Sequence, residues 1–306
     1  MGTAIISICH DDDYKLTEWH HHYLEYKDFA ALHIIVDNNS KLQFKNKLKE
    51  CFIDSVIIER ATNGGCTIAY NDGIRTALKN PNIDSIFLLG NDIKISCESL
   101  VILREILFSN VDYSMISPLV LRKDSNIVEN FGCMINGDLT LELLDVGKNY
   151  NDVSKTNKVV DAIPGGINLA KRVYYERVGL QDENLFMYSD EVDTGIRSKN
   201  ANFLTVASSY VHAWHQHINP NDKSQRHPYT RFLMARNKIY LAKKHFGILF
   251  MFKNFILLNY KFFRTICVYI LIGRFNLIVD EKYAVLGTFY GLIGNMSQNK
   301  YCNKPI

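Results

Sequence analysis

The sequence has few cysteines, and they form no metal-binding or disulfide pattern. Seven cysteines are scattered over 306 residues, and no two are spaced as CxxC. The odd number and the spacing argue against a zinc–cysteine site and against a disulfide framework, and reduced thiols are typical of a cytoplasmic protein. The first apolar run ends at His10 and has no basic segment before it, which does not fit a signal peptide. We therefore expect a cytoplasmic location.

Two common phosphate-binding motifs are also missing. A dinucleotide-binding Rossmann site needs GxGxxG directly after the first strand, but residues 10–15 read HDDDYK, and no Walker motif occurs in the chain. An acidic turn without glycine favours a nucleotide held through its base and ribose, with a metal ion neutralising the diphosphate. The same turn argues against a sugar nucleotidyltransferase, which would place a basic, glycine-rich loop there.

Acidic residues are absent from one long stretch near the C-terminus. Residues 1–222 hold 21 Lys and Arg against 30 Asp and Glu, whereas residues 223–279 hold 11 Lys and Arg and no acid. This change predicts two parts, a nucleotide-sugar-binding and catalytic domain over residues 1–222 and a basic helical region over residues 223–306. A basic region of this kind is typical of a protein that meets a negatively charged surface.

The first part alternates between strand-like and helix-like segments. Short, apolar, β-branched runs favour strands, and longer runs with helical periodicity favour helices. The pattern predicts strands at 3–9, 31–36, 53–58, 83–89 and 111–117, helices at 14–26, 42–51 and 66–78, and a hairpin region at 127–146. This alternation indicates an α/β fold, a Rossmann-like and mostly parallel sheet flanked by helices.

Later segments complete the prediction. Residues 159–163 are strand-like, and the segment after Gly165 and Gly166 is expected to be a helix that stops at Gly179. Short strands are predicted at 203–207 and 210–213, and helices at 231–246, 249–272 and 283–293, which form a helical C-terminal extension.

Polar residues follow four of the predicted strands. In open α/β sheets, ligands bind at the carboxyl ends of the strands. These ends carry His10 with Asp11, Asp37 with Asn38, Asn63 with Gly64, and Asn91 with Asp92. We expect the four ends to converge at one edge of the sheet and to form a nucleotide site.

A second group of carboxylates lies at residues 182–193, interleaved with aromatic and aliphatic side chains. It contains Asp182, Glu183, Asp190, Glu191 and Asp193. Carboxylates beside apolar rings are where a pKa is raised and a general base can be built. The spacing alone favours a simpler interpretation, the solvated first turn of a helix, where acidic residues are stabilised.

Several motifs, in the same order, resemble those of the family-2 glycosyltransferases of the GT-A fold, in particular the rhamnosyl- and galactofuranosyltransferase branch. They are VDNNS at 36–40, NGGCTIAYNDGI at 63–74, LLGND at 88–92 and GLQDENLFMYSDEVDTGIR at 179–197. The resemblance covers about residues 3–237. It implies an inverting, metal-dependent transfer of a sugar from a UDP- or dTDP-linked donor to a hydroxyl of a bacterial surface glycan, such as a capsule or O-antigen.

The resemblance also implies roles for individual residues. Asp92 and His212 would bind Mg or Mn, and Glu191 or Asp190 would be the general base that deprotonates the acceptor. The donor would be bound by His10, Asp11, Asp37, Asn63, Asn71, Asn91 and Arg231. The acceptor would contact Gly165, Gly166 and Trp214.

Two departures from the family pattern leave alternatives open. The first carboxylate of the family's DXD element is replaced by Gly90, so a carbohydrate-binding or scaffold protein that kept the fold without catalysis is also possible. The usual Glu-Asp pair is inverted to Asp190-Glu191, so that Glu191 stands where the base Asp is expected if the alignment has no gap. Its extra methylene moves the carboxylate by about one bond length, which matters because catalysis depends on positioning.

Structural roles also fit many of these residues. Asp92 could cap a helix, Asp37 could stabilise a turn, and Gly165 and Gly166 could form a bulge. His212 and Trp214 could be core residues, and Asn63 and Asn71 could serve only in a turn and a helix.

The basic C-terminal region alternates cations with phenylalanine and leucine. Its apolar runs are interrupted too often for a spanning helix, so a basic amphipathic helix at the membrane surface, near lipid-linked acceptors, is one prediction. The other is a helical subdomain that packs on the first domain or on a second subunit in a homo-oligomer. Nucleic acid is not an expected partner, because the aromatic residues lie within apolar runs rather than between cations.

Overall fold

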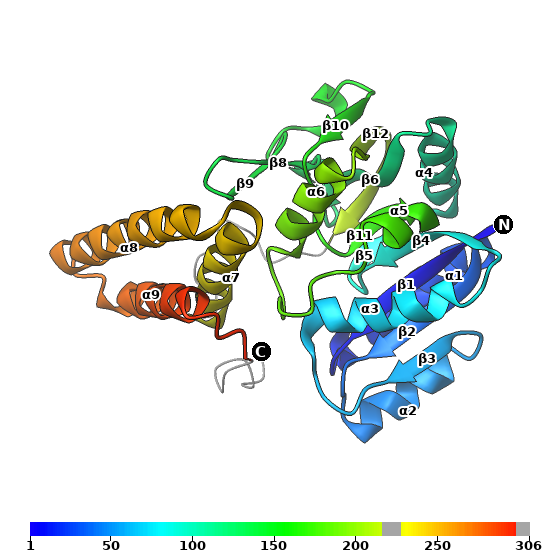
Figure 1. Cartoon of the computed structure of the whole chain (residues 1–306). Helices are drawn as coiled ribbons and strands as arrows, with labels where there is room; N and C mark the ends of the chain where they lie inside the picture. The colour runs from blue at the N-terminus through cyan, green and yellow to red at the C-terminus, as the bar shows by residue number, and fades with distance from the viewer. Residues whose placement is uncertain (216–227, 298–306) are drawn as a thin grey trace. The chain divides into compact units, whose positions relative to one another are not determined.

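The computed structural model describes residues 1–215 and 228–297, and the chain divides into two compact units (Figure 1). The first unit comprises Met1–Asn136, Thr140–Gln181 and Thr194–His217, and the second Gly137–Leu139, Asp182–Asp193 and Ile218–Ile306. The predicted boundary between residues 222 and 223 lies outside the described residues and stays a prediction. Sequence reasoning did not anticipate that the acidic segment Asp182–Asp193 belongs to the second unit.

A large mixed sheet is the centre of the first unit. Its strands are β1 (Gly2–Cys9), β2 (Ala30–Asp37), β3 (Val56–Glu59), β4 (Ile83–Leu89), β5 (Ile93–Lys94), β6 (Tyr113–Arg122), β7 (Val128–Asn130), β10 (Asn157–Val160), β11 (Ile167–Lys171) and β12 (Leu204–His215). The order is β10-β12-β6-β11-β4-β1-β2-β3, with β5 beside β12 and β7 beside β6. Strands β4, β1, β2 and β3 are mutually parallel, as are β6 and β12. The predicted α/β fold is confirmed.

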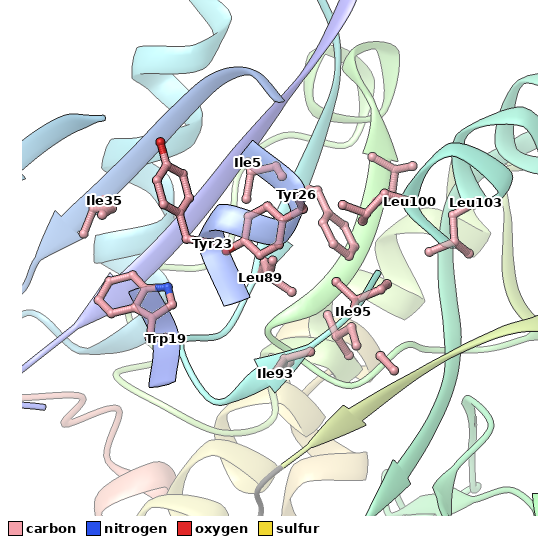
Figure 2. Packing of buried hydrophobic residues seen from close by; sticks show 14 of the residues in the cluster. Ile5, Trp19, Tyr23, Tyr26, Ile35, Leu89, Ile93, Ile95, Leu100 and Leu103 are labelled. Carbon is pink, nitrogen blue, oxygen red and sulfur yellow. The ribbon is translucent and has the colours of Figure 1, made fainter. Parts of the chain in front are cut away.

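Helices cover both faces of this sheet. Successive side chains along a strand point to opposite faces, so the buried strands present apolar side chains on both sides. The helices of one face are α1 (Asp13–Tyr26), α2 (Leu42–Cys51) and α4 (Cys97–Ser109), and those of the other are α3 (Gly65–Leu78) and α5 (Arg172–Arg177). Ile5 packs with the first group and Ile6 with the second. Figure 2 shows the first group, where Trp19, Tyr23 and Tyr26 of α1 pack near Ile5.

Several sequence predictions need correction. Residues 167–171 form strand β11, not the start of a helix, because this segment pairs antiparallel with β4 and β6 in the middle of the sheet and is buried along its whole length. The helix predicted to reach Gly179 is confined to α5. The two short strands predicted around residue 208 are one strand, β12, with a register shift between Ser208 and His212. The predicted hairpin is confirmed as β8 (Cys133–Ile135) and β9 (Leu141–Leu143).

The second unit is built on three helices, α7 (Pro228–Phe246), α8 (Ile248–Leu271) and α9 (Ile278–Leu292). Two glycines let α9 approach α7 closely. A Cβ atom at Gly287 would lie 2.2 Å from the Phe232 carbonyl oxygen, and one at Gly291 would lie 2.5 Å from the Arg236 carbonyl oxygen.

Helix α6 (Asp190–Asn200) begins within the acidic segment. Within residues 1–215 and 228–297, no helix combines the length and the apolar character needed to cross a membrane.

Six of the seven cysteines lie within the described residues. Cys9, Cys51, Cys66, Cys97, Cys133 and Cys267 form no disulfide. Cys302 lies outside the described residues.

Candidate functional site

The loops after β2 and β3 are joined by side-chain amides. Asn38 donates through Nδ2 to Asn63 Oδ1 at 2.9 Å, and its Oδ1 accepts from the Gly64 backbone N–H at 3.0 Å. Asp37, at the end of β2, is completely buried and accepts from the Ser40 backbone N–H at 3.2 Å. These bonds hold two of the four predicted strand ends together at one edge of the sheet.

The ends of β1 and β4 join the same edge. The Asp11 backbone N–H donates to Ser40 Oγ at 2.8 Å, which connects the loop after β1 to the loop after β2. Asn91, after β4, donates through Nδ2 to Asp12 Oδ2 at 2.8 Å, which connects the loop after β4 to the loop after β1. His10, in the loop after β1, is exposed. The four polar strand ends therefore lie together, as the parallel topology led us to expect.

Asp92 is the centre of a charged cluster. Its carboxylate lies 3.2 Å from Lys15 Nζ and 3.6 Å from His215 Nε2, and His215 Nδ1 lies 2.8 Å from Glu129 Oε1. Burial alone would raise the pKa of Asp92, but the hydrogen bond and charge of His215, together with the charge of Lys15, hold that pKa well below its usual range. Burial alone would lower the pKa of His215, but Asp92 and Glu129 raise it to about 9.

The histidine beside Asp92 is thus His215, whereas the sequence prediction was His212. The His212 ring packs against Tyr150, with ring centroids 4.8 Å apart, and against Trp214 at 4.5 Å. Burial lowers its pKa. His212 and His215 are three residues apart on β12, and residues an odd number apart on a strand face opposite sides of the sheet. The sequence contains both histidines but could not show which one faces Asp92.

A cavity of about 390 Å³ opens beside Asp92 within the first unit. Residues from α1, from the loop after β4, from the turn between β6 and β7 and from the end of β12 line it. They are Lys15, Glu18, His22, Asn91, Asp92, Lys94, Lys123, Asp124, Ser125, Asn126 and Trp214. The size is in the range of small-molecule sites, and the lining brings the predicted acceptor residue Trp214 to the same cavity as Asp92.

The predicted acceptor glycines lie directly before β11. Gly166 has φ +79°, a conformation that favours glycine, and a Cβ atom there would lie 3.3 Å from the Tyr70 hydroxyl. Its carbonyl oxygen accepts from the Gly90 backbone N–H at 2.7 Å. Gly165 is exposed. Gly166 therefore positions the backbone directly beside the loop that carries Asp92.

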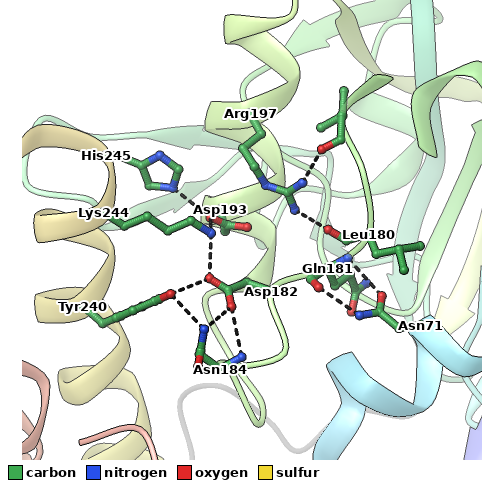
Figure 3. A network of polar contacts seen from close by, with 11 residues as sticks. Asn71, Leu180, Gln181, Asp182, Asn184, Asp193, Arg197, Tyr240, Lys244 and His245 are labelled. Atoms are coloured by element: carbon green, nitrogen blue, oxygen red, sulfur yellow. Dashed lines mark hydrogen bonds and ion pairs between the residues drawn. The ribbon is translucent and has the colours of Figure 1, made fainter. Parts of the chain in front are cut away.

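Asn71 uses its amide on the backbone, not on the cavity. Asn71 Nδ2 donates to the Gln181 carbonyl oxygen at 2.9 Å and its Oδ1 accepts from the Gln181 N–H at 3.0 Å (Figure 3). Arg197 donates to the carbonyl oxygens of Val178 and Leu180, at 2.7 and 2.8 Å. Both side chains fix the segment that follows α5.

The acidic segment is anchored to α7 within the second unit (Figure 3). Asp193 is fully buried and lies 2.6 Å from Lys244 Nζ and 2.8 Å from His245 Nε2. Asp182 accepts from the Tyr240 hydroxyl at 2.8 Å and from Lys244 Nζ at 2.6 Å. Two of the five carboxylates are therefore structural ion-pair partners.

The other pair, Asp190 and Glu191, begins α6. Tyr188 and Ser189 directly before it have φ of 69° and 63°, an uncommon conformation for residues other than glycine. Burial raises the pKa of Asp190 and raises that of Glu191 well above its usual range, and the charge of Asp190 raises the Glu191 pKa further. A carboxyl group whose pKa is raised in this way is suited to act as a general acid or base.

A buried amide holds this strained turn. Asn237 of α7 donates through Nδ2 to the carbonyl oxygens of Met187 and Tyr188, at 2.9 and 2.8 Å. Its Oδ1 in turn accepts from Arg236 Nη2 at 2.9 Å. Such strain persists only where surrounding contacts enforce it. Sequence reasoning missed Asn237, because nothing local to residue 237 marks its contact with residues about fifty positions earlier.

Two arginines of α7 have partners within the second unit. Arg231, predicted to bind the donor, lies 2.5 Å from Glu281 Oε1 and over the Phe262 ring. Arg236 is fully buried and bonded to Asn237. Both contacts stabilise the packing of the helices.

Replacing Asn237 with aspartate is expected to lower the kcat of the activity that the sequence motifs predict, with little change in KM. The carboxylate keeps an acceptor for Arg236 but offers no N–H to the carbonyl oxygens of Met187 and Tyr188, so the turn before Asp190 relaxes. Loss of these buried bonds costs about 1–3 kcal/mol of folding stability. Steady-state kinetics and thermal unfolding measure both effects.

The matched control is Asn254→Asp. Asn254 is also buried and donates to a backbone carbonyl, that of Phe250 at 3.0 Å in its own helix. We expect it to lose stability but to keep kcat. Equal losses of kcat in the two variants would show that Asn237 acts only through stability.

Comparisons with known proteins bear on this geometry. No known family model matches the chain. A hexosyltransferase of low-salt glycan biosynthesis from Haloferax volcanii, Agl10, is 27% identical over 226 residues, which cover 71% of this chain and 69% of that protein.

Solved structures share the architecture. GalNAc-T7, solved with UDP, GalNAc and Mn²⁺, superposes with a TM-score of 0.62 at 11% identity over 79% of this chain, which spans about half of that protein (48%). The mannosyltransferase PcManGT of Pyrobaculum calidifontis, solved with GDP-Man and Mn²⁺, gives 0.56 at 9% identity over 96% of this chain and 87% of that one. TarS of S. aureus (residues 1–349), solved with UDP-GlcNAc, gives 0.53 at 13% identity, over 79% and 67%.

The fold is that of the GT-A glycosyltransferases. In this GT-A fold the first unit supplies the sheet, the gathered strand ends and the cavity beside Asp92. The similarity in fold agrees with the resemblance found in the sequence motifs, although the particular family and branch named there stay predictions.

Proposed function

We propose that this protein is an inverting, metal-dependent glycosyltransferase that moves a hexosyl group from a nucleotide sugar to a hydroxyl of a surface glycan or its lipid-linked precursor. The observation that carries the proposal is the cluster of Asp92, His215 and Glu129 at the end of β4, beside three other polar strand ends. The GT-A fold and the similarity to a hexosyltransferase of glycan biosynthesis support the same class.

A divalent cation, Mg²⁺ or Mn²⁺, is proposed at Asp92. A metal-ligating histidine commonly has its second ring nitrogen on a carboxylate, and His215 has Glu129 at Nδ1 and Asp92 at Nε2. Because these two carboxylates raise the His215 pKa to about 9, binding of the cation at Nε2 would release the proton from that nitrogen. No group of three or more His, Cys, Asp or Glu suited to a metal occurs within residues 1–215 and 228–297. Donor phosphates and water would complete the ligand set, as is usual for Mg²⁺. When bound, the cation would neutralise charge on the leaving diphosphate.

Lys15 contributes a fixed positive charge at the same place. Its ammonium group lies 3.2 Å from Asp92 and lines the cavity. Burial alone would lower the Lys15 pKa, but the charges of Asp92 and Asp12 raise it, so the side chain stays protonated at neutral pH. A diphosphate placed in this cavity would therefore meet a cation of the protein itself.

The donor nucleotide is proposed to bind at the gathered strand ends. Asp37 would accept from the base, and Asp11 and Asn63 would line the ribose, with His10 and Asn91 nearby. UDP and dTDP are the expected nucleotides. Asn71 and Arg231 are also proposed to contact the donor. In the structure Asn71 is bonded to the backbone of Gln181, and Arg231 is paired with the carboxylate of Glu281.

The acidic pair is proposed to provide the general base. One carboxylate, of Glu191 or Asp190, takes the proton of the acceptor hydroxyl while that oxygen forms a bond to the anomeric carbon. The bond from this carbon to the diphosphate breaks, and the nucleoside diphosphate leaves. Because attack and departure occur on opposite faces, the anomeric centre is inverted. Gly165, Gly166 and Trp214 are proposed to contact the acceptor.

Calorimetric titration with UDP, dTDP and GDP, each with and without Mn²⁺, tests the proposal. We expect metal-dependent binding of one nucleotide, and release of that nucleotide from its hexose conjugate in the presence of acceptor sugars. Asp37→Asn, which keeps the shape of the buried side chain, is expected to weaken binding by about 10-fold or more through the loss of a charged acceptor.

Two outcomes would count against this function. If no nucleotide binds under any condition, the protein is not a glycosyltransferase. If a nucleotide sugar binds but no nucleoside diphosphate is released with any acceptor, the non-catalytic carbohydrate-binding alternative is favoured, consistent with the missing first carboxylate at Gly90.

A further inference from the structure

Helix α8 presents an exposed surface that is apolar along one strip and basic along the next. On its other side the helix is held within the second unit, where Asn259 donates to Thr288 Oγ1 of α9 at 3.0 Å and Phe255 contacts the Phe289 ring. At 3.6 residues per turn, the exposed apolar residues share one strip of the helix, which lies outside these contacts. It consists of Leu249, Phe252, Ile256, Tyr260, Phe263 and Ile270.

The basic strip follows the same helical spacing. Lys253, Lys261 and Arg264 are exposed and lie next to the apolar strip when the helix is viewed along its axis. Residues 248–279 contain a fourth cation, Arg274, and no acid. The apolar strip and these four cations together are called the α8 face below. Its own charges are all positive, and one of them, Lys261, lies 3.8 Å from Asp138 Oδ2 of the same unit.

The end of α8 and the turn after it are also apolar and exposed. Leu271 is 85% exposed, Phe275 is 63% exposed, and Ile272 is also exposed, with Arg274 between them in the chain. Large apolar side chains at this level of exposure, gathered on one surface, are unusual for a surface that faces only water. The α8 face is therefore suited to a partner that offers both an apolar layer and negative charge.

We propose that the α8 face lies in the surface of a lipid bilayer that contains anionic lipids, with α8 parallel to the bilayer plane. A helix with an apolar strip beside a basic one places its apolar side chains at the boundary of the acyl chains and its cations among the headgroups. The long stems of lysine and arginine can follow apolar surface while the charges stay in the headgroup layer. Anionic headgroups match the charge of the surface.

A second copy of the chain fits the α8 face less well. Most homodimers are built on a two-fold axis, so that the same patch meets itself. Pairing two α8 faces in this way would bring the same four cations of each copy together with no acid of residues 248–279 to compensate them. Like charges at short distance repel, whereas an anionic bilayer neutralises them.

Co-sedimentation of the whole protein with vesicles tests this proposal. Vesicles of phosphatidylcholine alone are compared with vesicles that also contain phosphatidylglycerol, and we expect binding to the second kind that weakens as salt is raised. The triple variant Lys253→Gln, Lys261→Gln, Arg264→Gln is expected to bind about 100-fold more weakly, because each cation near an anionic surface contributes about fivefold. The pair Phe252→Gln and Phe263→Gln is expected to lose about tenfold or more.

Matched controls come from the first unit. Lys79→Gln, Lys148→Gln and Lys199→Gln make the same change in net charge on another surface, and Ile53→Gln with Val111→Gln replaces two exposed apolar residues there. Both controls are expected to bind like the unmodified protein. Thermal unfolding checks that every variant is folded.

Three results would overturn the proposal. They are binding that does not depend on anionic lipid, binding that the α8 variants and the controls reduce equally, and no binding at all. Sedimentation velocity without lipid is run in parallel. A dimer that the Phe252 and Phe263 variants abolish, with vesicle binding unchanged, would assign the face to a second copy instead. Vesicle binding is measured without donor or acceptor, so this test stands or fails independently of the proposed sugar transfer.

Discussion

Replacing Glu191 with glutamine or Asp190 with asparagine is expected to lower kcat for sugar transfer by about 10²–10⁴-fold and to leave nucleotide binding nearly unchanged. The two side chains start α6, after a turn that Asn237 holds in an uncommon conformation. Whichever carboxylate is the base will show the larger loss. The other will show a smaller loss, because it acts only through its neighbour, as the charge of Asp190 does when it raises the pKa of Glu191.

The pH dependence of kcat provides a second measurement on the same pair. A general base works only when ionised, so activity is lost as the pH falls through the pKa of the base. Since burial raises the pKa of Asp190 and of Glu191, the acidic limb of the profile is expected above the usual carboxyl range of about 4. Replacing Asp190 removes a negative charge that raises the Glu191 pKa, so with Glu191 as the base the limb should then move to lower pH.

Glu183→Gln is the matched control for the acidic pair. Glu183 lies in the same segment but is exposed, and its replacement is expected to leave both kcat and the pH profile unchanged. If Glu183→Gln lost as much activity as the two central variants, the effect would belong to the charge of the segment as a whole. If neither Asp190→Asn nor Glu191→Gln lost activity, the base would have to be sought elsewhere.

Replacing Asp92 with asparagine is expected to abolish the metal-dependent part of nucleotide binding, with a loss of about 100-fold or more. The amide cannot supply the charge that a hard cation such as Mg²⁺ or Mn²⁺ requires. Calorimetry with and without Mn²⁺ separates this effect from any loss of metal-independent binding. If Asp92→Asn bound the nucleotide and Mn²⁺ as the unmodified protein does, the proposed metal position would be wrong.

The same experiment decides between the two histidines. His215→Gln is expected to weaken Mn²⁺-dependent binding by about 10–100-fold, and Glu129→Gln, which removes the partner of His215, by a comparable factor. His212→Gln makes the same substitution three residues away on β12, where the ring packs against Tyr150 and Trp214. A larger effect from His212 than from His215 would restore the sequence prediction and contradict the geometry.

Because the acidic segment belongs to the helical unit, four of its carboxylates fall into two groups. Asp182 and Asp193 are occupied by Lys244, Tyr240 and His245 of α7, so the basic end of α7 neutralises the structural carboxylates. Asp190 and Glu191 are left as a pair with raised pKa values. Helix α7 thus both anchors the segment and, through Asn237, sets the turn that precedes the pair.

Much of the fold was predictable because local periodicity reports local structure. The strands at β1, β2 and β4 and the helices α1, α2 and α3 were found close to their observed bounds, since apolar spacing and polar boundaries mark them directly. Strand β11 was missed because its residues are buried on both faces in the middle of the sheet and carry no alternation that separates strand from helix. The gathering of the four strand ends followed from parallel topology alone.

The sequence by itself determined the α/β class, the polar strand ends, Asp92 as the candidate metal ligand and the change to a basic helical region. Each of these features depends on the type and spacing of residues within a short stretch of the chain, so it can be read without knowing which distant residues are in contact. Only the tertiary structure decided that His215 and not His212 meets Asp92, that Glu129 supports it from 86 positions away, and that Asn237 holds the turn before the acidic pair. Each of these contacts joins residues far apart in the chain, and it forms only when strand register and helix packing bring them together.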